Sequence, residues 1–367
     1  MKFIHTADLH IGAKPDADRA WGPAREDAVR HALERMADIC DQEGIDLLLI
    51  AGDLFHFPPT EAMLKETDTW FARMPRTRVV ITAGNHDYLR PGCAFSRHAF
   101  PSNVTLLAQP CLQTVSFPEL GVDVSGFSYD CEILRENPAE GVQPPRSGLR
   151  HILMLHGGDR EHAPVNFAAM QNAGWDYIAM GHIHKPSLNE AGKAAMPGTP
   201  EPLNRNETGE HGFYQGEMDA RGLTLAWRRF SRFLYTDLNI NITPDATQSG
   251  LEALLRKRLQ TDGSEVCRII LSGRRDPALV FDRDALLRLG PVSDVIDRTL
   301  PDYDWDAFAE RPEQDILRRT IRALAPDETD EAADGGTDGE APLRQKALYY
   351  ALDALLASES KRQEVLR

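Results

Sequence analysis

Five short motifs of Asp, Asn and His constrain this chain most, because each of them follows a short apolar run. In order they are Asp8-Leu9-His10, Gly52-Asp53, Gly84-Asn85-His86-Asp87, His156-Gly157 and Gly181-His182-Ile183-His184. Most contain a glycine, which lets the backbone turn where a strand ends. Open α/β sheets usually place their sites on the loops at strand ends. The pattern therefore predicts an α/β fold that gathers these polar side chains in one place.

Strand-like and helix-like stretches alternate along the first part of the chain, which predicts a layered α/β domain. Further strands are expected at 194–196, 212–218 and 223–230, and a turn over 219–222 joins the last two as a hairpin. We expect these strands to complete a second sheet, so that two sheets pack face to face with helices outside. The earlier predicted elements are strands at 2–6, 46–51, 78–83, 122–127, 151–155 and 177–180, and helices at 23–43 and 60–74.

A second, smaller α/β unit is expected from about Tyr235. The segment 326–340 is acidic, contains Gly-Gly and has no aromatic residue, which is typical of a disordered linker. An amphipathic helix is predicted over 343–366. The predicted elements of the smaller unit are strands at 237–242 and 266–272 and helices at 249–259, 282–289 and 313–324. The expected division is 1–234 for the sandwich, 235–325 for a capping domain, 326–342 for the linker and 343–367 for a C-terminal helix.

The motif residues are of the types that bind hard or borderline divalent cations. Asp8 and His10 lie two apart on an extended segment, so both side chains point the same way and can bind one cation. Asp53 is our choice for a bridging carboxylate, because its two oxygens can contact two cations. The allocation that fits best places Asp8, His10, Asp53 and His184 on one metal and Asp53, Asn85, His156 and His182 on the other.

Two cations held about 3.5–4 Å apart can clamp a phosphodiester, with a metal-bridged hydroxide as the nucleophile. His86 is expected beside the cations, where it donates a proton to the leaving alkoxide or holds the phosphate. A single Asp-x-His or Gly-Asn-His-Asp is more often a turn. Five such motifs in order make that structural explanation improbable.

Composition and charge limit the class of protein and the cellular compartment in which this chemistry can occur. The chain has 367 residues and a net charge of −15, which counts against a protein that simply coats DNA. Bound cations would supply local positive charge, so DNA chemistry remains compatible. Five scattered cysteines indicate a reducing compartment. Met1 leads directly into a strand, and no apolar run approaches the ~20 residues of a membrane span. We therefore expect a cytoplasmic protein that does not span a membrane.

The motif set resembles the calcineurin-like metallophosphoesterase superfamily. The segments 5–12, 52–56 and 197–202 resemble its DNA double-strand-break repair nucleases, the SbcD- and YhaO-like branch, over roughly residues 1–235. The resemblance implies a four-layer αββα core and manganese-dependent DNA cleavage. It also implies a coiled-coil ATPase partner of the SMC type and a homodimer. The seven ligands named above match the family's metal ligands, and His86 matches its catalytic residue.

One position departs from the wider superfamily. Many members carry Gly-Asp-x-x-Asp, whose second Asp orients the catalytic His, and this chain has His56 there. Either Asp87 or His56 is then a candidate for orienting His86. His56 is alternatively a phosphate contact or a packing residue. The resemblance leaves these interpretations open.

Two further assignments stay open. Arg228, Arg229 and Arg232 lie in a run that mixes cations and aromatics, as in nucleic-acid contacts, although a two-faced strand is the simpler explanation of the run. The C-terminal helix either docks on a partner ATPase or packs on its own domain. The leading hypothesis is a two-metal DNA nuclease acting in repair. The alternatives are a phosphodiesterase or phosphatase for small molecules or cyclic nucleotides, and a non-catalytic scaffold.

Overall fold

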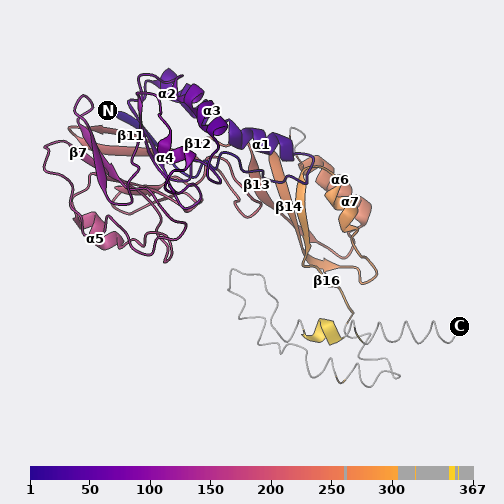
Figure 1. Ribbon diagram of the computed structural model, residues 1–367. Coiled ribbons are helices and arrows are strands. Elements are labelled where there is room, and N and C mark those ends of the chain that lie inside the picture. Colours follow the sequence, from indigo (N-terminus) through magenta and orange to yellow (C-terminus); the bar gives the residue numbers. More distant parts are fainter. Residues whose placement is uncertain (260–262, 305–318, 320–346, 352–353, 355–367) are drawn as a thin grey trace. The chain divides into compact units, whose positions relative to one another are not determined.

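The computed structural model describes residues 1–259, 263–304, 319, 347–351 and 354 (Figure 1). One compact unit comprises Met1–Thr236 with Gln260–Cys267, and the other comprises Asp237–Leu259 with the described residues that follow Cys267. The expected helix at 313–324 and linker at 326–342 lie outside the described residues, except for residue 319. Of the expected C-terminal helix, residues 347–351 and 354 are described, and they are helical.

The first sheet has six strands in the order β12-β11-β1-β2-β3-β4. Strands β1 to β4 are parallel neighbours. They span Lys2–Thr6 (β1), Leu47–Ala51 (β2), Arg78–Thr82 (β3) and Val104–Leu106 (β4).

The predicted hairpin exists, but our expectation about its sheet was wrong. Strands β11 (Gly212–Asp219) and β12 (Gly222–Arg229) join the first sheet, because β11 pairs antiparallel with β1. Without this hairpin, β1 would present a row of unpaired backbone groups at the sheet edge.

The second sheet has the order β5-β6-β7-β8-β10-β9. Strands β6, β7, β8 and β10 run parallel, while β5 and β9 pair antiparallel at the two edges. The strands span Gln113–Phe117 (β5), Val122–Gly126 (β6), Arg150–His156 (β7), Tyr177–Gly181 (β8), Ser187–Leu188 (β9) and Ala194–Met196 (β10).

Alternation along the strands produces the layers, since neighbouring side chains of a strand face opposite sides. On β2, Leu48 and Ile50 pack against helices α2 (Ala32–Glu43) and α3 (Glu61–Phe71). Leu47 and Leu49 face the core shared with the second sheet. The outer face of that sheet packs against α5 (Phe167–Asn172) through Met170. The predicted order helix, sheet, sheet, helix is confirmed (Figure 1).

The helix expected at 23–43 is two helices. α1 (Gly22–Arg30) ends at His31, whose φ of −94° and ψ of 13° leave the helical region, and α2 begins at the next residue. The backbone hydrogen bonds continue through this change of direction, since the His31 N–H donates to the Asp27 carbonyl oxygen at 3.0 Å and the Arg35 N–H donates to the His31 carbonyl oxygen at 3.1 Å. A further short helix, α4 (Ala94–Arg97), follows β3.

The smaller unit carries a third sheet in the order β13-β14-β15, and β16 pairs with β14. Its helices are α6 (Gln248–Arg258) and α7 (Arg283–Leu287). Among the described helices, none combines the length and apolar character needed to cross a membrane. The strands span Leu234–Ile242 (β13), Glu265–Arg275 (β14), Val292–Asp297 (β15) and Leu300–Pro301 (β16).

A buried histidine on β1 makes the stability of this fold depend on pH. His5 Nδ1 lies 2.7 Å from the Tyr177 hydroxyl, and its Nε2 lies 3.0 Å from the Met180 carbonyl oxygen. Burial lowers the pKa of His5 to about 3. The unfolded chain, where the pKa is about 6.5, therefore binds a proton that the folded chain does not. This part of the stability is present above pH ~6.5 and declines as the pH falls below it, by at most about 1.4 kcal/mol per pH unit.

We predict that His5→Gln removes this dependence. The difference in free energy of unfolding between wild type and variant should shrink as the pH falls from 6.5 to 4.5, because only the wild type loses stability through this group. Urea denaturation at several pH values measures the difference. A difference that stays constant across the range would show that His5 does not titrate in this way.

Candidate metal centre

The predicted site residues lie on loops at the carboxyl ends of five strands from both sheets. The main chain of each loop turns sharply there, so the polar side chains converge at one rim of the sandwich. The residues so placed are Asp8 and His10 after β1, Asp53 after β2, Asn85 and His86 after β3, His156 at the end of β7, and His182 and His184 after β8.

The backbone of the site is strained at four of these positions. Asp8, His10, Asp53 and His182 have φ values of 55°, 47°, 50° and 97°. Non-glycine residues rarely adopt positive φ, at a cost of about 1–3 kcal/mol each, and such strain clusters at functional sites. The fold therefore accepts a loss of stability at these four positions, which directs their side chains toward the site.

Two glycines allow the loops to approach closely. A Cβ on Gly52 would lie 2.2 Å from His156 Nδ1, and a Cβ on Gly84 would lie 2.2 Å from Asp53 Oδ1. Any side chain at either position would displace a site residue. This explains the glycines that accompany Asp53 and Asn85 in the motifs.

Asp8, His10 and His184 form one group of candidate ligands, since one ligand atom from each lies within 4.8 Å of the others. His10 Nε2 is 3.2 Å from His184 Nε2 and 3.7 Å from Asp53 Oδ2. His184 Nε2 is 3.8 Å from Asp8 Oδ1. Imidazole nitrogens and carboxylate oxygens that face one another in this way match the donor set of a divalent transition-metal ion.

Asp53, Asn85, His156 and His182 form the second group. His156 Nε2 is 3.3 Å from Asp53 Oδ2 and 3.0 Å from Asn85 Oδ1. His182 Nδ1 is 3.2 Å from Asn85 Oδ1. Asp53 Oδ2 thus lies near a histidine of each group, which is the position of a bridging carboxylate.

Burial makes the charges of the site costly. It raises the pKa of the Asp8 carboxyl and lowers the pKa of His10 well below its usual range. Burial also opposes a charge on His156, but the adjacent Asp53 carboxylate outweighs it and raises the pKa of His156 to about 9. The two buried carboxylates therefore attract positive charge, which divalent cations supply.

Three of the histidines have one ring nitrogen toward the site and the other held by an acceptor. His184 Nδ1 is 2.9 Å from Glu207 Oε1, and His182 Nε2 is 2.8 Å from Asp159 Oδ2. His156 Nδ1 is 2.9 Å from the Ala51 carbonyl oxygen. Metal-binding histidines are almost always held in this way, which fixes the ring and leaves a lone pair for the cation. The residues present therefore fit a pair of divalent metal ions.

Sequence reasoning missed three residues that support this centre. Besides Asp159 and Glu207, the Thr199 hydroxyl lies 2.8 Å from the Asp8 carbonyl oxygen and donates to it or to the Glu201 carbonyl oxygen, 2.7 Å away. Asp159 lies three residues after His156, and Thr199 lies in the segment 197–202 that carries the family resemblance. Their positions near these motifs are the sequence features that could have pointed to Asp159 and Thr199. Nothing in the sequence around Glu207 distinguishes it from a surface carboxylate.

His86 lies beside the first group and is oriented by backbone. Its ring contacts the His10 ring edge to face at 4.8 Å and stacks on the His56 ring at 5.2 Å. Its Nδ1 lies 3.1 Å from the His56 carbonyl oxygen. Of the two candidates for orienting His86, the structure therefore brings His56 into contact, through both its main-chain carbonyl and its ring.

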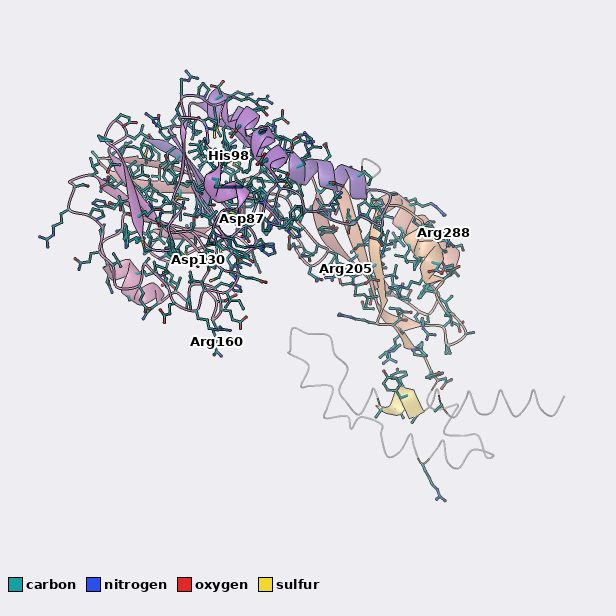
Figure 2. All side chains as sticks on the ribbon, viewed as in Figure 1. Asp87, His98, Asp130, Arg160, Arg205 and Arg288 are labelled. Atoms are coloured by element: carbon teal, nitrogen blue, oxygen red, sulfur yellow. The ribbon has the colours of Figure 1, made fainter. Side chains whose placement is uncertain are left out.

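The other candidate, Asp87, is fully buried; Figure 2 labels its place in the larger unit. Its carboxylate accepts hydrogen bonds from the backbone N–H groups of Phe55, at 3.1 Å, and Gly84, at 2.8 Å. Burial, helped by the nearby Asp53, raises the pKa of Asp87 to about 7. Asp87 thus ties together the loops after β2 and β3, and these contacts lead away from the His86 ring.

The three arginines proposed for DNA contact are paired with acidic side chains at the surface. The pairs are Arg228 with Glu43 at 2.7 Å, Arg229 with Glu210 at 3.6 Å and Arg232 with Asp27 at 3.7 Å. The assignment to nucleic-acid binding stays a prediction.

The chain matches the family model described as calcineurin-like phosphoesterase over residues 1–186. It is 28% identical over 301 residues to the uncharacterized metallophosphoesterase YhaO of Bacillus subtilis, covering 74% of this chain and 72% of that protein. It is 29% identical to the DNA double-strand break repair protein Mre11 of Methanopyrus kandleri, covering 61% and 55%. It is 28% identical to the SbcD component of the nuclease SbcCD of Rhodobacter capsulatus, covering 58% and 65%.

The matched segment and the two-sheet sandwich with its rim of Asp, Asn and His define a metal-dependent phosphodiester hydrolase. The chain belongs to the calcineurin-like phosphoesterase family, as the motifs predicted. The alignments with the latter two relatives cover 55% and 65% of those proteins.

We predict that Asp159→Asn weakens one of two metal sites. The amide keeps the shape but loses the charge that holds His182 Nε2, and loss of such a contact typically lowers metal affinity about 10–100-fold. Titration calorimetry with Mn²⁺ should show one site weakened and the other retained. Glu161→Gln is the matched control, because Glu161 pairs only loosely with Arg135, at 3.8 Å. Equal weakening of both sites, or unchanged affinity, would contradict this role.

Proposed function

We propose that this protein is a two-metal DNA nuclease that hydrolyses phosphodiester bonds and acts in DNA repair. Relatives named as a double-strand break repair protein and as part of a nuclease support this proposal. The segment Gly52–His56, which resembles that branch, contributes both Asp53 and the His56 carbonyl that contacts His86.

We assign the seven expected ligands to two cations, as the motifs suggested. Asp8, His10, Asp53 and His184 would hold one cation, and Asp53, Asn85, His156 and His182 would hold the other, with Mn²⁺ as the proposed ion in both. When bound, two such cations neutralise phosphate charge and lower the pKa of a water molecule so that it can attack. Asp159, Glu207 and the Ala51 carbonyl would keep the other nitrogen of each histidine ring turned toward the cations.

The observation that carries the catalytic proposal is the placement of His86. Since its Nδ1–H donates to the His56 carbonyl, Nε2 is the nitrogen left to carry a transferable proton. In the protonated state, Nε2–H can donate to the leaving alkoxide, and the neutral ring then regains its proton from water. Stacking on the His56 ring keeps the imidazole beside His10 during this exchange.

Partners and domain roles follow from the same proposal. The sandwich over 1–234 carries catalysis, and the unit over 235–325 acts as a capping domain. A coiled-coil ATPase of the SMC type docks on the C-terminal segment after the linker, and the nuclease forms a homodimer in the cytoplasm. Arg228, Arg229 and Arg232 would exchange their carboxylate partners for DNA phosphates.

We predict Mn²⁺-dependent degradation of linear duplex DNA by the purified chain. Asp53→Ala should abolish it, because both ligand groups lose an oxygen. His86→Ala should lower the rate by about 10²–10⁴-fold while both metals stay bound, because it removes a proton donor rather than a ligand. Hydrolysis of linear duplex, single-stranded DNA and a chromogenic phosphodiester, with metal content measured on the same samples, tests this.

The outcomes separate the alternatives. Turnover of only the small diester would favour a small-molecule phosphodiesterase. Two bound metals per chain with no turnover of any substrate would favour a scaffold. A His86→Ala protein that loses a metal would show that His86 is a ligand and refute its assigned role.

A further inference from the structure

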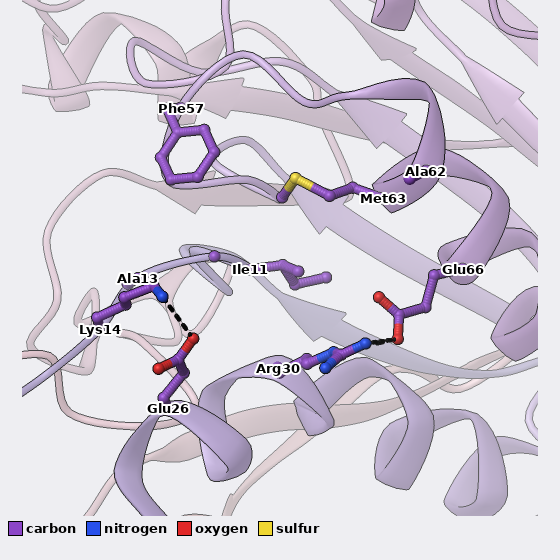
Figure 3. A pocket seen from close by; sticks show the side chains of 10 residues that line it. Ile11, Ala13, Lys14, Glu26, Arg30, Phe57, Ala62, Met63 and Glu66 are labelled. Atoms are coloured by element: carbon purple, nitrogen blue, oxygen red, sulfur yellow. Dashed lines mark hydrogen bonds and ion pairs between the residues drawn. The ribbon is translucent and has the colours of Figure 1, made fainter. Parts of the chain in front are cut away.

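A pocket of about 490 Å³ opens between the segment after β1, helix α1 and helix α3 (Figure 3). Its volume falls within the ~300–1,000 Å³ range of small-molecule sites. We propose that this pocket binds a nucleobase of the substrate strand, from a nucleotide next to the scissile phosphodiester. The proposal rests on the nuclease function proposed above and names where that nuclease holds a base.

The pocket is lined by residues that directly follow residues of the metal centre in the sequence. Ile11 and Gly12, in its wall, directly follow His10, and Phe57 directly follows His56. The ring contacts continue from the centre to the pocket, since His56 stacks on His86 at 5.2 Å and contacts Phe57 at 6.2 Å. A nucleotide carries its phosphate and its base on one sugar. A phosphate bound beside His86 therefore leaves a neighbouring base within reach of Phe57.

The inner surface of the pocket suits a flat, apolar ligand. It is formed by the side chains of Ile11, Phe57, Ala62 and Met63 (Figure 3). Phe57 is 45% exposed, which is unusual for a phenylalanine, and it lines the pocket, so part of its ring is accessible to a ligand there. Bases stack on aromatic side chains whatever their sequence, and the Met63 thioether is a soft, adaptable neighbour.

Glycine keeps this surface open. Gly12 has a φ of 101°, and a Cβ there would lie 3.0 Å from the Phe57 ring and 3.1 Å from the Met63 methyl group. A side chain at position 12 would therefore push against the two residues that offer the stacking surface.

The charges around the pocket favour a base over a phosphate. Its two cations are each paired with a carboxylate, Lys14 with Glu26 at 3.1 Å and Arg30 with Glu66 at 2.5 Å (Figure 3). The lining is thus neutral overall, so it offers little attraction for an anion. The same four side chains provide donors and acceptors for the polar edge of a base.

The first test measures binding without catalysis. We would titrate 2′-deoxyadenosine into the 367-residue chain in EDTA and follow ligand NMR signals. Phe57→Ala, which removes the ring, and Ala62→Leu, which fills the pocket, should each weaken binding about tenfold or more, as expected for loss of base stacking. Phe57→Trp should retain binding, because the indole also stacks. Leu188→Ala is the matched control, since Leu188 is also 45% exposed but lies on β9.

The second test uses substrate in Mn²⁺. Oligonucleotides with an intact or an abasic nucleotide beside a single cleavable phosphodiester are compared by kcat/KM. Wild type and Leu188→Ala should prefer the intact substrate by roughly tenfold. In Phe57→Ala the ratio of the two values should fall toward one, which a general loss of activity or folding would not produce.

Deoxyadenosine binding that neither Phe57→Ala nor Ala62→Leu weakens would overturn the pocket as a base site. Equal turnover of the intact and abasic substrates by wild type would overturn the assignment to the substrate strand, even if free nucleoside binds. Retained deoxyadenosine binding with no cleavage of any oligonucleotide would instead refute the nuclease function, and with it the substrate strand as the source of the base.

Discussion

The Asp53 carboxylate is the group on which the rest of the centre depends. One of its oxygens lies near His10 on the first sheet and near His156 on the second, and the other accepts the His86 backbone N–H at 3.0 Å. One buried side chain therefore joins the rims of both sheets and fixes the start of the segment that carries the proposed proton donor. This placement requires a positive φ at Asp53 and a residue without a Cβ at position 84.

Local pattern was enough to predict most of the elements of the sandwich but not how distant elements pair. The predicted limits of the first strand, Lys2–Thr6, match the structure, because a short β-rich run that leads directly into the Asp8-Leu9-His10 motif defines them. The hairpin was also predicted from its turn at 219–222. The sheet that the hairpin joins was predicted wrongly. The choice between the two sheets depends on which strand lies at an open edge, and a short sequence segment does not contain that information. The break at His31 escaped notice because a helical pattern continues through it.

The candidate site shows the same division between local and distant information. Motifs that combine ligand side chains with strand ends predicted which residues gather at the rim. They could not predict Asp159 or Glu207, which contact the outer ring nitrogens from other loops and have no periodicity of their own. The position of Asp87 next to His86 in the sequence also does not reveal what its side chain contacts. It follows His86, yet its carboxylate turns toward backbone N–H groups while the His56 carbonyl reaches the ring.

The contacts of the centre join residues that lie far apart along the chain. His10 meets His184 across 174 positions, and Glu207 then holds the His184 ring. Contacts of such separation form late in folding, because the chain must close long loops first. A chain still emerging from the ribosome thus carries Asp and His residues without a shaped metal site until synthesis has passed Glu207. The metal centre would then take its shape only when the sandwich is nearly complete, because its last supporting contact comes from Glu207.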